Sequence, residues 1–565
     1  MIRFRARWLA GCLAAISALA AAGISPAQEP GDSQGPVSHR APIHRAAAMG
    51  NTLEVRRLLD AGVGVNLAVD DPDNPDEMGI TPLIIASGAA EADAALLRLL
   101  LERGADVHGA TAAGVTAMLV ASARGDPSRV EMLIDAGADV NHADAFGNFP
   151  LLAAAAGDHL EAVTQLLAAG AEVDRRRPDG VTALGEAMQF ASRGVIDILL
   201  DAGASIETVD SRGFSPLMNA AARGERELVE ALLMGGVDVN ERNRYGATPL
   251  MAAAQSGTPE VIRLLIEEGA EVEARFRGFS EGEIEEAQAA AEEAGQPFAP
   301  AAPDNSTALT FATTAGQAEN VQALIDTGAD LEVVDRTGLT PLLHAAVRLN
   351  LEKVRLLVKA GAAIDATGPN GQTPLMFAAW NGHSEMTRFL VDRDANVKLV
   401  DQDGRTALAW AVLFGDAKTV EILLSAGADV QISPPGAPLL VLAAEGDDAE
   451  KVRLLIEAGA IVDAPADDGT TALIAAAGSG GHAALQALLA AGAAVEAKDA
   501  DGRTALIWAA GEGTPGAVRM LRDAGADASI RDIHGHSALE YAEGRAAGDP
   551  ARAAIVEMLK KDTSR

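Results

Sequence analysis

The side chains best suited to metal chemistry gather in one acidic segment. Residues 70–77 read DDPDNPDE, and their carboxylates could hold Ca²⁺, which prefers oxygen ligands. The spacing does not match an EF-hand loop, because Pro75 occupies a ligand position and no glycine follows where the loop turns. We therefore interpret this segment as a solvated acidic loop and expect no metal there.

The sequence lacks the residue patterns that catalysis requires. The ten histidines are scattered, and none stands with a glutamate at the i, i+4 spacing of a zinc site. No nucleophile elbow, Walker loop or dinucleotide fingerprint occurs. Cys12 is the only cysteine, and a chain cleaved after Ala27 would contain none, which excludes disulfides and thiolate sites. We predict no catalytic residue, cofactor or metal.

The elements that position the side chains follow from a repeating pattern in the sequence. A threonine or serine stands at the same position in most repeats, which we call the marker position. From Thr116 onward nearly all neighbouring marker positions are 33 residues apart. A period of this length, held over about fifteen units, indicates stacked modules rather than one globular core. The marker positions are Ala41, Thr81, Thr116, Phe149, Thr182, Ser215, Thr248, Thr307, Thr340, Thr373, Thr406, Pro438, Thr471, Thr504 and Ser537.

One repeat, residues 340–371, shows the local chemistry. Thr340 can cap a helix with its hydroxyl, and Pro341 suits the first helical position, where an N–H would be unpaired. The small Ala345 and Ala346 lie on one stripe and let a neighbouring helix approach closely. A second helix follows, and Gly361 can end it in a left-handed conformation. Asp-x-x-Gly turns connect the repeats.

Three segments carry a family resemblance: Thr340-Pro341-Leu342, Thr373-Pro374-Leu375 and residues 137–141, which read GADVN. They resemble the ankyrin repeat, and the resemblance covers about Ala41 to the C-terminus. It implies an all-α fold, an α-solenoid of about fifteen helix-turn-helix repeats with β-turn or hairpin connections, over residues 41–565. It also implies a non-enzymatic scaffold that binds a protein through its hairpin tips and the concave face of its inner helices.

Aromatic residues make up 3% of the chain. If the repeats are ankyrin-like, the position of each aromatic residue within its repeat predicts whether it is buried or exposed. Trp410 and Trp508 follow their threonines by four residues, a phase that implies core packing. Aromatic residues seven or eight positions after the threonine, or at the tips of the turns, are expected to be exposed. Exposed aromatic side chains are typical of interface hot spots. The alternative for each candidate is packing on the next repeat. The candidates are Trp380, Phe190 and Phe414 toward the concave face, and Phe146, Phe214 and Tyr245 at turn tips.

An inserted segment adds further candidates. The step from Thr248 to Thr307 is 59 residues and indicates an insertion at about 275–303. Arg275, Phe276 and Arg277 precede an acidic stretch that we expect to be helical. The insertion could extend the binding surface, or it could be a tolerated excursion without a partner. A second alternative is an enzyme site built around it, for which no convergent acid and base are visible.

The first 27 residues predict export. Arg3, Arg5 and Arg7 precede an apolar run at residues 8–22, and small residues end at Ala27, as in a secretory signal peptide. The run is shorter than the roughly 20 residues of a spanning helix, so we expect no integral membrane segment after cleavage. The mature protein would be periplasmic or secreted, with residues 28–40 as a polar linker. The alternative is a bacterial lipoprotein anchored at Cys12.

Charge narrows the class of partner. The formal net charge is −35, which repels nucleic acid and anionic lipid and favours a basic or neutral protein partner. The alternative is that acidity serves only solubility. We take the chain as a monomer by default. A secreted effector that engages a host protein is the alternative to a scaffold acting in the cell envelope.

Overall fold

Paired helices build the part of the chain that the computed structural model describes. The described residues are 41–69, 78–90, 94–190, 192–209, 213–278, 303–512, 514–544 and 549–562. Within these ranges the helices form fifteen consecutive pairs, and the only β-structure is three isolated bridges. The all-α solenoid expected from the sequence is confirmed. None of the described helices has the length and apolar character needed to cross a membrane.

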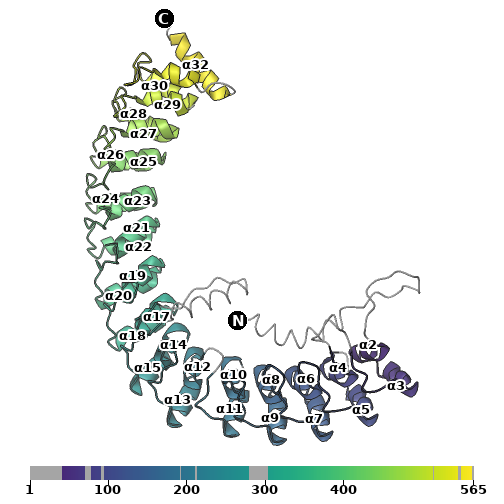
Figure 1. Ribbon diagram of the computed structural model, residues 1–565. Helices are drawn as coiled ribbons and strands as arrows, with labels where there is room; N and C mark the ends of the chain where they lie inside the picture. Colours follow the sequence, from purple (N-terminus) through teal and green to yellow (C-terminus); the bar gives the residue numbers. More distant parts are fainter. Residues whose placement is uncertain are drawn as a thin grey trace, which may run out of the picture. The chain divides into compact units, whose positions relative to one another are not determined.

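The helices fall into two compact units (Figure 1). The first unit contains α2 (Pro42–Ala48), α3 (Thr52–Asp60), α4 (Pro82–Gly88), α5 (Ala94–Glu102), α6 (Ala117–Arg124), α7 (Pro127–Asp135), α8 (Pro150–Ala156), α9 (Leu160–Ala168), α10 (Ala183–Phe190), α11 (Arg193–Asp201), α12 (Pro216–Arg223), α13 (Arg226–Met234), α14 (Pro249–Ser256) and α15 (Pro259–Glu267).

The second unit contains the remaining pairs. They are α17 (Ala308–Thr314), α18 (Ala318–Asp326), α19 (Pro341–Val347), α20 (Leu351–Ala360), α21 (Pro374–Trp380), α22 (Ser384–Val391), α23 (Ala407–Leu413), α24 (Ala417–Ser425), α25 (Leu439–Glu445), α26 (Ala449–Glu457), α27 (Ala472–Ser479), α28 (His482–Ala490), α29 (Ala505–Glu512), α30 (Pro515–Asp523), α31 (Ala538–Gly544) and α32 (Pro550–Asp562).

Local chemistry fixes where the helices begin and end. The hydroxyl of Thr340 accepts a hydrogen bond from the backbone N–H of Leu343 at 3.3 Å, which satisfies one unpaired donor at the start of α19. Pro341 occupies the first helical position, as predicted. Gly361 ends α20 at φ 101°, a conformation that only glycine adopts without strain.

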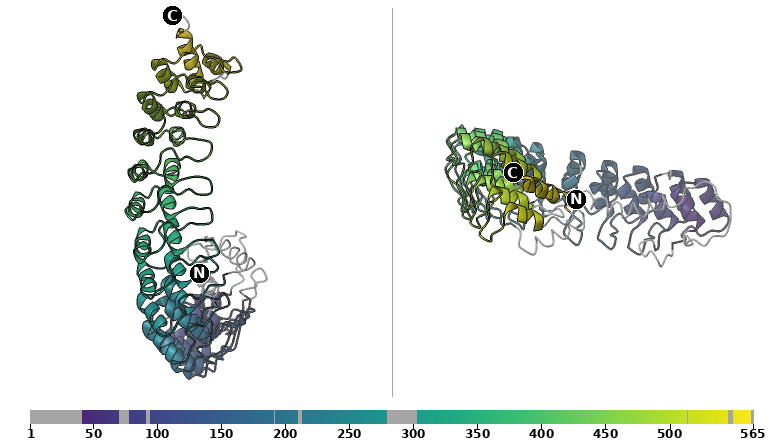
Figure 2. Two further views of the ribbon diagram at one scale, coloured as in Figure 1. Left: turned by 90° about the vertical axis from the view of Figure 1, so that its left-hand side faces the viewer. Right: turned by 90° about the horizontal axis from the view of Figure 1, so that it is seen from above.

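Each unit buries its apolar side chains between neighbouring pairs. The first helices of successive pairs pack in one row and the second helices in another, as Figure 1 shows within each unit. Ala345 and Ala346 are fully buried, and Leu342 beside them is 1% exposed, so the predicted stripe is confirmed. Small alanines between the rows allow close contact and dense packing. The loops of the second unit project from one edge of its rows (Figure 2).

Side chains also tie each repeat to the next through its backbone. Asn141 donates to the carbonyl of Gly170 at 3.1 Å and accepts from the N–H of Glu172 at 2.8 Å. Asn240, three repeats later, makes the same two bonds with Gly269 and Glu271. A single amide thus satisfies a donor and an acceptor of the following repeat, which fixes the spacing between the two.

Candidate protein-binding surface

A buried carboxylate organises the turn before each of several first helices. In the turn at residues 401–404, one oxygen of Asp401 accepts the N–H groups of Asp403 at 3.0 Å and Arg405 at 2.9 Å. Gly404 takes φ 72°, which lets the chain reverse there. Asp401 itself is buried. The turn is therefore held by the side chain that begins it.

The second oxygen of this carboxylate reaches into the following helix. The indole N–H of Trp410 donates to Oδ2 of Asp401 at 2.9 Å. The same link, always across nine residues, joins His344 to Asp335 (2.5 Å), Trp508 to Asp499 (2.7 Å) and Tyr541 to Asp532 (2.7 Å). We call these pairs the turn–helix ties. They were missed in the sequence, although an aspartate followed nine residues later by His, Trp or Tyr is a pattern that could have revealed them.

Two of these aspartates titrate below their ordinary range. Burial alone would raise the pKa of Asp335, but hydrogen bonds from His344 and Thr337 outweigh burial and lower it. Burial acts the same way on Asp532, and the bonds from Tyr541 and two backbone N–H groups again lower the pKa. The hydrogen bond to Asp532 raises the pKa of the Tyr541 hydroxyl. These two ties therefore hold the charged forms of Asp335 and Asp532 inside the fold.

One tie supports a cluster of three aromatic rings, Trp380, Trp410 and Phe414, which we call the aromatic patch. Trp380 stacks on Trp410 with ring centroids 4.9 Å apart and an interplanar angle of 24°. Phe414 lies 6.1 Å from Trp380 and 5.7 Å from Trp410. Trp410 is 7% exposed, whereas Trp380 is 41% and Phe414 59% exposed. The patch thus has a buried base and two exposed rings.

The base of the aromatic patch is fixed from several sides. Arg405 lies over the ring of Trp410, with its guanidinium carbon 4.9 Å from the ring centroid, and also pairs with Asp403 at 2.5 Å. Asp401 holds the indole nitrogen. Trp380 ends α21 and Phe414 caps α23, two helices that pack against each other. The exposed rings therefore rest on a preorganised support.

The turn-tip candidates lie on separate turns of the first unit. Phe146 is 68% exposed, and its N–H donates to Asp144 at 2.9 Å. Tyr245 is half-buried, with the guanidinium of Arg244 4.6 Å from its ring centroid. Phe214 is also half-buried. Of the three, Phe146 presents the largest exposed apolar surface. The side chain of Phe190, at the end of α10, lies outside the described residues.

The prediction that Phe276 belongs to a binding surface is wrong. Its side chain is 5% exposed and meets Phe311 edge to face, with ring centroids 5.4 Å apart. Its backbone pairs with Ser306 and Asn305 across the start of α17. The ring fills the core because this backbone pairing turns it toward the helix. Arg275 and Arg277 on either side are exposed. The helix expected within the insertion lies outside the described residues, as does the acidic loop at residues 70–77.

Comparison with known proteins defines the family. The family model for ankyrin repeats, in three copies, matches residues 117–210, 187–275, 288–368, 350–433 and 439–532. The chain belongs to the ankyrin repeat family. Ankyrin repeats generally mediate protein–protein interactions and are typically not enzymes. A search of curated proteins finds no match.

Among solved structures, this ankyrin repeat chain is similar to the crystal structure of the human ASB11 ankyrin repeat domain. The two share 28% identity over 41% of this chain and 99% of that one, with a TM-score of 0.36.

The tryptophans of the ankyrin array divide between core and surface. Trp410 is buried, as predicted. Trp508, also predicted to be core, is only half-buried, and the guanidinium of Arg503 lies over its ring, 4.1 Å from the centroid. The difference arises because Trp410 has Trp380 stacked on it from the preceding repeat, whereas Gly478 stands at that place beside Trp508.

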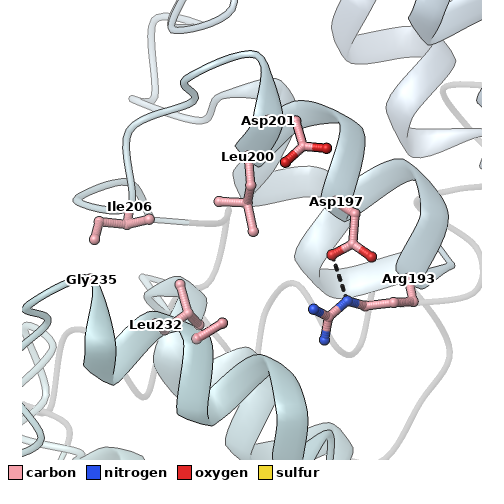
Figure 3. A pocket seen from close by; sticks show the side chains of 8 residues that line it. Arg193, Asp197, Leu200, Asp201, Ile206, Leu232 and Gly235 are labelled. Atoms are coloured by element: carbon pink, nitrogen blue, oxygen red, sulfur yellow. Dashed lines mark hydrogen bonds and ion pairs between the residues drawn. The ribbon is translucent and has the colours of Figure 1, made fainter.

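A hollow in the first unit was not predicted from the sequence. It lies between the second helices α11 and α13, with Leu200, Ile206 and Leu232 on its walls (Figure 3). Arg193 and Asp197 form an ion pair at 2.6 Å on its rim. Across the described residues, no group of three His, Cys, Asp or Glu side chains converges to hold a metal ion. Arg193 and Asp197 neutralise each other, Asp201 adds one further carboxylate, and the remaining lining is mostly apolar.

Proposed function

We propose that this ankyrin repeat protein is a non-enzymatic scaffold that binds a protein partner through the aromatic patch. The observation that carries the proposal is the exposed pair Trp380 and Phe414 resting on the buried Trp410. Large aromatic side chains on a rigid support bury much apolar area at little entropic cost, which is typical of interface hot spots. Phe146 is a second contact point for a partner of the first unit.

The partner can be identified by crosslinking from the exposed edge of the aromatic patch. A photo-crosslinking residue replaces Phe414, and the adduct is identified by mass spectrometry from cell envelope and medium. The identified protein is then purified and titrated against the unmodified chain. We expect the double substitution Trp380→Ala, Phe414→Ala to weaken binding at least about tenfold, since hot-spot truncations cost about 2 kcal/mol or more.

A matched control separates the aromatic patch from general surface stickiness. Ile461 is 62% exposed in the same unit, and Ile461→Ala removes a similar apolar surface away from the aromatic patch. Binding should be unchanged in this variant. Equal losses in both variants, or a partner that binds the double variant as tightly as the original chain, would refute the proposal.

The overall charge supports a basic or neutral partner at this surface. A net charge of −35 raises the encounter rate with basic proteins and opposes binding of nucleic acid. We propose the same preference for this partner, with the chain acting as a monomer. Binding to the identified partner should weaken as salt rises if the charge contributes, and it should be insensitive to salt if acidity serves solubility alone.

We also propose that the protein is exported, as a periplasmic or secreted scaffold or as an effector delivered to a host. The support is the N-terminal pattern of arginines, apolar run and small residues before Ala27. Mass spectrometry of the exported chain gives its first residue. An N-terminus at Gln28 supports signal-peptide cleavage, an acylated Cys12 supports the lipoprotein alternative, and an intact Met1 inside the cell would refute export.

A further inference from the structure

A second hollow lies on the second helices of the second unit. Side chains of α20, α22 and α24, and of the residues just after α22, line this hollow. Its four cations are Arg355, Arg388, Arg393 and Lys418, and they surround the ring of Phe389 and the side chain of Ile422. We call it the basic hollow. Four cations gathered at one place are unusual on a chain whose net charge is −35.

The arginines of the basic hollow differ from several arginines on other second helices, which form ion pairs within their own helix. Arg453, for example, bonds to Glu450 and Glu457, and Arg226 to Glu230. In the described part of the chain, Arg355, Arg388 and Arg393 have no ion pair. Arg355 and Arg393 instead lie over Phe389, 5.1 and 5.3 Å from its ring centroid. Their hydrogen-bond donors are therefore available to a ligand.

Two carboxylates, Glu385 and Asp392, also line the basic hollow, and Lys418 pairs with Glu421 at 2.6 Å. They reduce the positive charge without reversing it, because three guanidinium groups remain unpaired. Guanidinium forks match carboxylates in a bidentate geometry, and the partly buried Phe389 offers an apolar contact beside them.

We propose that the basic hollow docks an acidic protein segment that also carries an apolar or aromatic side chain. Charge complementarity selects carboxylates, and Phe389 with Ile422 selects the apolar side chain. A nucleic acid or an anionic membrane fits less well, because it would extend beyond the basic hollow and meet the acidic surface of the remaining chain within a Debye length of about 8 Å. This surface is distinct from the aromatic patch, which lies on the first helices.

The proposal is tested by fluorescence anisotropy with the full chain and a labelled peptide of Glu, Gly and Phe residues. We expect binding that is lost when Gln replaces each Glu of the peptide. The triple variant Arg355→Gln, Arg388→Gln, Arg393→Gln should bind the peptide about tenfold more weakly or worse, since each charge-assisted bond contributes enough for such a change. These side chains are exposed, so the melting temperature should be retained.

A control triple keeps the change in net charge but leaves the basic hollow intact. Arg336→Gln, Arg453→Gln, Arg519→Gln removes three exposed arginines of the same unit. Peptide binding should be nearly unchanged. Equal weakening in both triples would show only general electrostatics and would overturn the proposal. Absence of peptide binding, or a short DNA duplex that binds as tightly through the same three arginines, would overturn it as well.

Discussion

At the scale of single residues, the aromatic patch depends on one buried carboxylate. Asp401 closes its turn with one oxygen and holds the indole of Trp410 with the other, and Trp380 stacks on that indole. A buried carboxylate oxygen that loses its donor costs more free energy than the bond itself contributes. A substitution at Trp410 should therefore change both the aromatic patch and the stability of the fold, whereas a substitution at Phe414 should change only the exposed surface.

Trp410→Phe removes this donor while keeping an aromatic ring. We expect the free energy of unfolding to fall by about 1–3 kcal/mol, because Oδ2 of Asp401 is left buried without its partner. Phe414→Ala should change it by no more than about 0.5 kcal/mol, since Phe414 is 59% exposed. Urea titrations of both variants check this. A loss in Phe414→Ala as large as that in Trp410→Phe would show that Phe414 is a core residue.

The tie at Asp335 predicts a dependence of stability on pH. Its pKa is lowered in the folded chain from the ordinary value of 3.8, so the folded state binds a proton less readily than the unfolded state. The resulting stabilisation is fully present above the ordinary pKa and is lost as the pH falls through the folded pKa.

We expect the stability difference between the original chain and Asp335→Asn to shrink in acid below pH 3.8. Urea unfolding at neutral pH and in acid measures it. A difference that stays constant over this range would show that the carboxylate charge of Asp335 does not contribute.

At the scale of elements, buried cations connect consecutive repeats. Nζ of Lys353, at the start of α20, donates to the carbonyls of Ala312 and Thr313 at 2.9 Å each. These carbonyls lie at the end of α17 in the preceding repeat, where the helix leaves acceptors unpaired and its dipole favours a cation. Arg129 does the same at the end of α4, donating to Ala89 at 2.9 Å. The second helix of one repeat thus caps the first helix of the repeat before it.

Lys353→Met should remove this cap with little change in side-chain volume. We expect a loss of about 1–3 kcal/mol, because two buried carbonyls lose their donor. Lys359→Met is the matched control, since Lys359 lies exposed on the same helix. Thermal or urea unfolding compares the two variants. If they were equally stable, the carbonyls of α17 would be satisfied without the lysine.

At the scale of the whole molecule, the array is two compact units, each built from contacts between neighbouring repeats. In such an array, stability is approximately a sum over repeats and their interfaces, so one cooperative transition is not guaranteed. The tryptophans provide a probe of one unit, because Trp380, Trp410 and Trp508 all lie in the second.

Leu166→Ala creates a cavity in the first unit. We predict that it lowers the unfolding midpoint measured by circular dichroism, which reports on both units, more than the midpoint measured by tryptophan fluorescence. The fully buried Leu166 should contribute about 2–5 kcal/mol. A Trp8→Phe background confines the fluorescence to the second unit. Equal shifts by both probes would show that the two units unfold together.

The sequence alone determined the helical pairs, their number, most of their caps and the family. These features rest on local chemistry: a hydroxyl before a proline, small residues on one stripe, and a residue at positive φ where a helix ends. The position usually held by glycine is filled by Asp394, which still takes φ 64°. A repeated local rule therefore survives single exceptions, because the neighbouring repeats impose the same backbone path.

Only the tertiary structure decided which side chains are available for binding. Phe276, from its place in the insertion, and Trp380, from its position in the repeat, were both predicted to be exposed. Phe276 instead packs on Phe311, while Trp380 remains 41% exposed on Trp410. The unpaired arginines of the basic hollow also come from different repeats. Whether such an aromatic ring is buried, or such an arginine forms an ion pair, depends on side chains about one repeat away in the chain. A repeat pattern fixes where each backbone segment lies, but the side chains brought together across the repeat interface decide its chemistry.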